Sequence, residues 1–272
     1  MITAVKPTLT HVIPSQGSVA AVTSLGDDVF VARHYSHQVE VYDAVTLTLQ
    51  RRLTVPGLLG SPSGLAACSN NNCLYASDWN NSVHRVELSG SNAVKKWSVA
   101  RGPEGLSVNR EHNLIVTCIN ANKLQEYTTQ GSLVREICLQ AGVTEPWHAI
   151  QLSTGDYVVS HWKLPGVISV VGVDGHVVRS SYRQLQTSHV GQMESPSSLA
   201  VTKNDDILVL DTGNGRILLI NSSLASVQQL ALSVDGGIRK PQGLCLDESR
   251  GRLYIGEWLG KQQVLVFDDV RL

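Results

Sequence analysis

The sequence predicts an all-β fold, a six-bladed β-propeller with four antiparallel strands in each blade. One turn motif recurs roughly every 40 to 50 residues, and short β-rich runs separated by polar turns follow each copy. The ends of the chain agree with this, because a lone strand near the N-terminus matches a last unit that lacks its fourth strand. We therefore expect one propeller domain over residues 1–272.

The recurring motif consists of proline, a variable residue, a small residue, and leucine or a β-branched residue. Four copies are well kept: Pro62–Leu65, Pro103–Leu106, Pro196–Leu199 and Pro241–Leu244. Pro146–Ile150 is a degraded fifth copy, and Ser15–Val19 stands in the first position without its proline. A motif repeated in this way indicates six copies of one supersecondary unit rather than separate domains.

Each copy of the motif is followed by a polar turn and then by a run of Val, Ile, Leu and Tyr. Such runs, bounded by Gly, Asn and Asp, are typical of strands. No stretch has the sustained 3.6-residue periodicity and capping residues of a helix. The six runs are Val29–Ala32, Leu74–Ser77, Leu114–Thr117, Tyr157–Ser160, Ile207–Leu210 and Leu253–Gly256.

The two ends of the chain predict how the ring closes. The last unit offers three strands and ends near Asp268, whereas Pro7–Ile13 forms a strand that belongs to no complete unit. We expect this N-terminal strand to complete the last blade as its outer strand. Closure of this kind leaves only short, protected sheet edges.

The repeat resembles the NHL repeat: a proline motif, a strand ending in Asp, an Asn/Gly-rich turn, and Arg-Ile opening the next strand. The fifth unit carries it best, with Pro196–Leu199, Ile207–Asp211 and Thr212–Ile217. The sequence is thus similar to the NHL propellers of TRIM-type ubiquitin ligases. It has no RING, B-box or coiled coil and no Cys/His cluster with zinc spacing, so the resemblance does not imply ligase activity.

The Asp position of the repeat departs most from the family pattern. In NHL repeats this Asp fixes the following turn, so the resemblance implies structural roles for Asp78 and Asp211. Where the residue differs, the position is released from that task and can serve specificity. In order along the chain the six units hold Arg33, Asp78, Cys118, His161, Asp211 and Glu257.

Rare residues gather at equivalent positions of the repeat, which predicts that they share one face. In a propeller, the loops that enter the innermost strands and the loops that leave the second strands open on the same side. Trp and Arg are the residues most often found at binding hot spots. We call this side the Trp face, and its expected ligand-binding residues are Trp79, Trp147, His148, His161, Trp162, Trp258, Arg33 and His34.

This face predicts a non-catalytic binding platform for a protein, peptide or glycan partner, without cofactor, metal or catalytic residues. RNA binding is one alternative, but Asp and Glu interrupt the basic loop residues Arg33, Arg101, Lys123, Lys163, Arg216 and Lys261. A metal-dependent channel enzyme like the lactonases and lyases is another. Its residues would include Glu104, His148 and His161, which do not form a specified metal site.

The bulk properties set the remaining expectations. A net charge of −1 and a pI near 6.7 provide no overall field toward nucleic acid or an anionic membrane. Five cysteines, an odd number, favour free thiols and a cytoplasmic setting. Two Asn-x-Ser patterns, at Asn80 and Asn221, favour secretion weakly. We expect a monomer that does not bind membranes.

Overall fold

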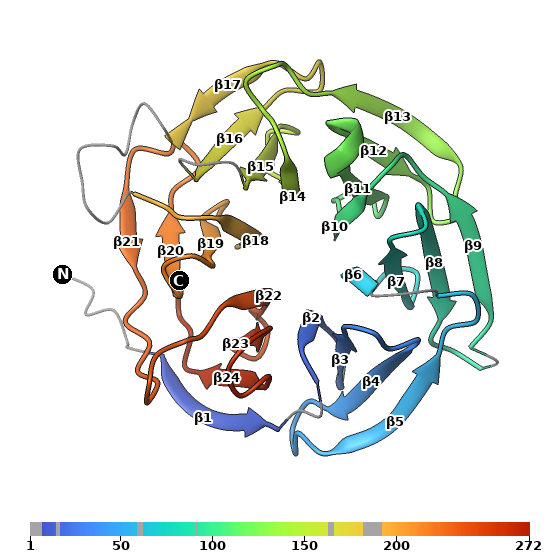
Figure 1. Cartoon of the computed structure of the whole chain (residues 1–272), viewed down its shortest axis with the longest axis vertical. Coiled ribbons are helices and arrows are strands. Elements are labelled where there is room, and N and C mark those ends of the chain that lie inside the picture. Colours follow the sequence, from blue (N-terminus) through green and yellow to red (C-terminus); the bar gives the residue numbers. More distant parts are fainter. Residues whose placement is uncertain (1–6, 15–16, 59–61, 91, 163–165, 182–191) are drawn as a thin grey trace.

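The structure is a computed structural model, and it describes residues 7–14, 17–58, 62–90, 92–162, 166–181 and 192–272. Six four-stranded antiparallel sheets stand around a central axis as the blades of a propeller (Figure 1). This confirms the predicted fold class. Ser15 and Gln16 of the first motif copy, and Lys163, lie outside the described residues.

Within blades 1 to 5 the strands run in chain order from the central axis outward. Blade 1 contains β2 (Val19–Leu25), β3 (Asp28–Arg33), β4 (Gln38–Asp43) and β5 (Leu49–Thr54). Blade 2 contains β6 (Pro62–Cys68), β7 (Cys73–Asp78), β8 (Ser82–Glu87) and β9 (Val94–Ser98). Blade 3 contains β10 (Pro103–Val108), β11 (Leu114–Cys118), the short 3₁₀ turn η1 (Ile119–Ala121), β12 (Lys123–Tyr127) and β13 (Leu133–Cys138).

The second half of the ring repeats this arrangement. Blade 4 contains β14 (Pro146–Gln151), β15 (Tyr157–His161), β16 (Val167–Val171) and β17 (Val177–Ser180). Blade 5 contains β18 (Pro196–Val201), β19 (Ile207–Asp211), β20 (Arg216–Ile220) and β21 (Val227–Gln229). Blade 6 contains β22 (Pro241–Asp247), β23 (Arg252–Glu257), β24 (Val264–Asp268) and β1 (Thr8–Ile13). No helix among the described residues is long and apolar enough to span a membrane.

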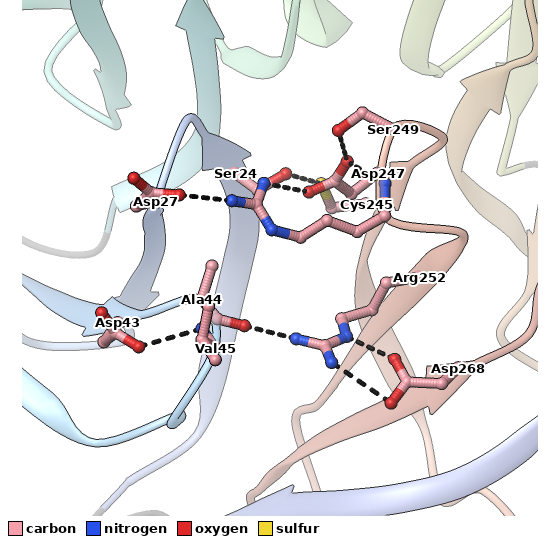
Figure 2. Close-up of polar contacts among 11 residues, drawn as sticks. Ser24, Asp27, Asp43, Ala44, Val45, Cys245, Asp247, Ser249, Arg252 and Asp268 are labelled. Carbon is pink, nitrogen blue, oxygen red and sulfur yellow. Dashed lines mark hydrogen bonds and ion pairs between the residues drawn. The ribbon is translucent and has the colours of Figure 1, made fainter.

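The ring closes as the sequence predicts. Strand β1 pairs antiparallel with β24, so the first strand of the chain is the outer strand of the last blade (Figure 1). Two arginines of blade 6 then reach across to blade 1. Arg250 binds Asp27 at 2.5 Å, and Arg252 donates to the Ala44 carbonyl while it also pairs with Asp268 (Figure 2). The junction between the two ends of the chain is therefore held by side chains as well as by strand pairing.

The hydrophobic core lies between the blades. Each core cluster among the described residues is made by two neighbouring blades, and the clusters together cover all of the blade-to-blade interfaces. Phe30 and Leu74, for example, belong to one cluster between blades 1 and 2. Because each blade is covered on both faces, the second strand of each blade contains a continuous apolar run, such as Ile207–Leu210 in β19.

The small residue of the motif lets the innermost strands approach one another. A Cβ on Gly64 would lie 2.5 Å from the carbonyl oxygen of Glu104 in the next blade. At Gly105 it would lie 2.6 Å from the carbonyl oxygen of Trp147. Each innermost strand also shifts register at this point, as at Pro103/Leu106 in β10. The motif therefore builds a β-bulge at the start of each innermost strand.

We expect Gly105→Ala to destabilise the propeller, because its methyl group would overlap the backbone of β14 and the ring of His148. Overpacking of this kind costs about 1–3 kcal/mol. The matched control is Gly142→Ala, since a Cβ there would lie 3.8 Å from its nearest neighbour. Chemical denaturation of both variants measures the difference, and equal stabilities would contradict the packing role given to Gly105.

Cys68 and Cys73 face each other across the β6–β7 hairpin. Both are buried free thiols, as the odd cysteine count favours. Burial raises the pKa of the Cys73 thiol, which keeps it protonated at neutral pH.

Candidate functional site

The strand register places the predicted site residues on one face. In every blade the first residue of the innermost strand pairs with the last residue of the second strand, for example Pro62 with Asp78 and Pro146 with His161. The six Asp-position residues therefore form a ring at the same end of the channel. The loops that follow them carry Trp79, Trp162 and Trp258, and these loops form the Trp face.

Three indoles of the Trp face are open to solvent. Trp79 is 66% exposed, Trp162 46% and Trp258 43%. Trp97 lies instead on the outer strand β9, where it packs against Tyr75 and Tyr127. Exposed tryptophan is costly in water and is enriched where a protein contacts a partner.

Two of these tryptophans are ordered by aromatic neighbours. The rings of Trp147 and Trp162 meet edge to face with centroids 4.4 Å apart. On the other side of the channel, the His34 ring lies 6.2 Å from that of Trp258, and its Nε2 is 3.1 Å from the Gln242 side-chain oxygen. Tyr35, which the sequence analysis did not single out, is 91% exposed beside His34.

Asp78 and Asp211 have the structural roles that the NHL resemblance implies. One carboxylate oxygen of Asp78 accepts hydrogen bonds from the amides of Asn80 and Ser82, and the other contacts His84 Nε2 at 2.9 Å. Asp211 accepts from the Glu194 amide and binds Arg216 at 2.9 Å. Both carboxylates are buried and fix the turn that follows them.

Arg33 is engaged within its own blade, contrary to the expectation that its position is released for a ligand. The guanidinium is buried, pairs with Glu40 at 2.7 Å and contacts Tyr42. Cys118 is also buried, and burial raises the pKa of its thiol to about 12. Neither side chain is presented to solvent on the Trp face.

His161 differs from Arg33 and Cys118 because its imidazole has an unused polar atom. The ring is buried and its Nε2 has no hydrogen-bond partner among the described residues. Burial lowers the pKa of His161 to about 4, so the ring is neutral at pH 7.

His148 joins three blades. Its Nε2 lies 3.0 Å from the Leu106 carbonyl oxygen in blade 3, and its Nδ1 accepts a hydrogen bond from the Leu199 amide in blade 5. This pattern assigns the proton to Nε2. Burial lowers the pKa of His148 and favours the neutral ring that both contacts require. With both ring nitrogens engaged, the side chain has no free atom for a metal or a substrate.

The innermost strands surround a channel of about 280 Å³. Most of the side chains at the variable position of the motif are bonded to other parts of the protein. Ser63 donates to the Pro103 carbonyl at 2.7 Å, Ser197 bonds the Thr212 hydroxyl at 2.6 Å, and Gln242 contacts His34.

Glu104 is the exception in this ring. Its side chain lines the channel and is 8% exposed, and its carboxylate has no hydrogen bond or ion pair among the described residues. Burial raises the pKa of Glu104 to about 7. Sequence reasoning noted Glu104 but did not select it, although it is the one acidic residue in the variable position of the motif.

The described part of the chain offers few other groups for binding a metal ion or a phosphate. It contains no group of three or more His, Cys, Asp and Glu residues that could hold a metal ion. Several basic residues of the Trp face are already paired, since Lys123 binds Glu136 at 3.1 Å and Arg216 binds Asp211. Arg101 and Lys261 remain exposed on this side.

Comparison with known proteins identifies one repeat of the propeller. Residues 194–218 match the family model described as NHL repeat, and they span the whole of the best copy of the motif. The chain is a six-bladed β-propeller that carries an NHL repeat in its fifth blade. Its resemblance to the propellers of TRIM-type ligases stays a prediction from the sequence.

The propeller is similar to several solved structures. A streptogramin B lyase covers 95% of the chain and 96% of its own length, with a TM-score of 0.66 and 13% identity. A catalytically inactive virginiamycin B lyase from Staphylococcus aureus, solved with quinupristin, gives a TM-score of 0.67 at 13% identity over 94% of this chain and 82% of its own. Hydrazine synthase of Kuenenia stuttgartiensis gives 0.66 at 19% identity, over 95% of this chain and 79% of its own. At these identities the likeness concerns the fold alone.

Among curated proteins, the chain is similar to the U3 small nucleolar RNA-associated protein 15 homolog of Gallus gallus. The two are 29% identical over 119 residues, which is 42% of this chain and 19% of that protein. The matched segment is therefore about a fifth of the curated relative.

Proposed function

We propose that the chain is a non-catalytic binding platform that takes an extended peptide, or a loop of a partner protein, across its Trp face. The observation that carries this proposal is the set of exposed indoles, Trp79, Trp162 and Trp258, on loops that follow equivalent strand ends at one end of the ring. Rigid aromatic side chains offer large contact areas at little cost in conformational entropy. Their positions are fixed by strand ends, which favours a preformed site.

The polar groups of the same face support binding over catalysis. His148 is held between two backbone groups and cannot accept a proton without losing the Leu199 contact. An acid–base mechanism in the channel would therefore rest on Glu104 alone. RNA ranks below a peptide because a phosphate-tracking surface needs unpaired cations, whereas Lys123 and Arg216 are paired with carboxylates.

To test the proposal, the wild-type protein is screened against peptide, glycan and RNA arrays. Each hit is then titrated against the wild type and Trp162→Ala. We expect a saturable peptide ligand whose affinity falls by about 2 kcal/mol, or roughly thirtyfold, on loss of this indole. Surface substitutions usually change stability by less than about 0.5 kcal/mol, so the melting temperature should stay close to that of the wild type.

The matched control is Leu133→Ala, which removes a 51% exposed side chain from the outer strand β13. It should leave both affinity and stability unchanged. A peptide that binds Trp162→Ala as tightly as the wild type would contradict the proposal. Hits confined to the glycan or RNA arrays would replace the peptide by that ligand class.

A further inference from the structure

The entrance of the channel combines an isolated carboxylate with an aromatic pair. Glu104 and Trp147 both line the channel, on the adjacent strands β10 and β14. The two strands touch where Gly105 meets the Trp147 carbonyl. Trp162 then packs edge to face on Trp147 and stands exposed above it.

Charge along the channel lining is of one sign. Glu104 is the only acidic residue, and His148 the only basic one, among the described residues that line the channel. His148 is neutral because both of its ring nitrogens are engaged with backbone groups. The rest of the lining is aliphatic, apart from Trp147 and a few hydroxyl, thiol and amide groups such as Thr23, Ser107 and Gln242. A buried carboxylate without a partner is unfavourable, and an entering cation would remove that cost.

We propose that the channel entrance binds a basic side chain of the peptide partner, a lysine ammonium or an arginine guanidinium, between the Glu104 carboxylate and the Trp147–Trp162 pair. The statement that this cation belongs to a peptide rests on the proposed function above. The aliphatic stem of such a side chain suits the apolar channel wall, and an indole face attracts the charge. A divalent metal suits the entrance less well, because it takes six or more oxygen ligands and the channel supplies one carboxylate.

Binding of a cation should depend on pH through Glu104. The pKa of its carboxyl is about 7 in the free protein, and only the ionised form attracts a cation. Affinity for a lysine or arginine peptide should therefore fall as the pH drops below about 7 and should level off at the affinity of Glu104→Gln. The other titratable groups that line the channel are His148, whose pKa is lowered, and Cys245, whose pKa burial raises to about 11. Neither gains charge as the pH falls from 8 to about 6.5, where Glu104 takes up its proton.

The test uses blocked hexapeptides, based on a peptide found in the array screen, that carry lysine, arginine, norleucine or glutamate at one position in turn. Titrations are run on the wild type, on Glu104→Gln and on Glu111→Gln. Glu111 is the matched control because it is exposed in the turn at the far end of blade 3. We expect lysine and arginine to bind about tenfold or more tightly than norleucine, with this preference lost only in Glu104→Gln.

A second probe, n-butylammonium chloride, separates the two proposals. It carries the lysine head group without a peptide and should quench tryptophan fluorescence in the wild type but not in Glu104→Gln. Peptide binding without a charge preference, or with one that survives Glu104→Gln, would overturn this inference and leave the proposed function standing. If n-butylammonium binds saturably but no peptide ligand is found, the cation site is supported and the proposed peptide partner is wrong. If neither the hexapeptides nor n-butylammonium bind, both proposals are overturned.

Discussion

His148→Ala should destabilise the propeller by about 3–5 kcal/mol, as expected when a buried side chain and its hydrogen bonds are lost. The substitution leaves the Leu106 carbonyl and the Leu199 amide without their partner at the closely packed innermost strands. Both groups belong to blades other than that of His148, so the loss affects three blades together. A domain of this size is stable by about 5–15 kcal/mol, which makes the effect a large fraction of the total.

Urea denaturation at pH 7.5 measures this change, with Trp162→Ala as the matched control from the same blade. Trp162 is exposed, so its removal should leave the midpoint within about 0.5 kcal/mol of the wild type. If His148→Ala were as stable as Trp162→Ala, the joining role assigned to His148 would be wrong. His148→Ala should also unfold with a similar denaturant slope if the six blades remain one cooperative unit.

Glu104→Gln should stabilise the protein, and the gain should depend on pH. The pKa of this carboxyl is raised from 4.5 to about 7, so the folded state holds its proton more tightly than the unfolded state does. Wild-type stability therefore decreases as pH rises from about 4.5 to 7 and then levels off. At about 1.4 kcal/mol per pH unit, the full effect is about 3 kcal/mol.

The measurement is the difference in unfolding free energy between Glu104→Gln and the wild type at pH 4.5, 6 and 8. It should grow by about 3 kcal/mol from the lowest to the highest pH. Subtraction cancels the opposite effect of His161, whose lowered pKa makes the fold more stable as pH rises from about 4 to 6.5. Glu111→Gln, at an exposed site, should give a constant difference. A constant difference for Glu104→Gln would mean that a partner stabilises its carboxylate.

The fold could be predicted because its evidence is periodic and local. The spacing of the proline motif predicted the number of blades. The lone strand Thr8–Ile13 predicted that the ring closes by pairing of β1 with β24. Position within the repeat also predicted the Trp face, since equivalent residues of each unit meet at one end of the channel. The turn-fixing roles of Asp78 and Asp211 followed from the same equivalence.

What could not be predicted depends on partners from distant parts of the chain. Arg33 looked released from a structural role, but Glu40 and Tyr42 on the neighbouring strand engage its side chain. His148 looked like a binding residue, whereas its contacts lie in the blades on either side. Glu104 is the one acidic residue in the variable position of the motif, but only its surroundings in the fold show that its carboxylate lacks a partner.

Hydrogen–deuterium exchange of the protein with and without its array-selected peptide tests the central claim most directly. The account predicts protection in the Trp-face loops, residues 33–38, 78–82 and 257–263, and in the peptide that contains Glu104 and Gly105. Some amides of these loops are held by a single backbone bond, such as that from Trp258 to the Lys240 carbonyl, and should exchange faster in the free protein than in the complex. Turns at the opposite face, residues 69–72 and 202–206, should not change. Protection there, or along the outer strands, with an unchanged Trp face would contradict the account.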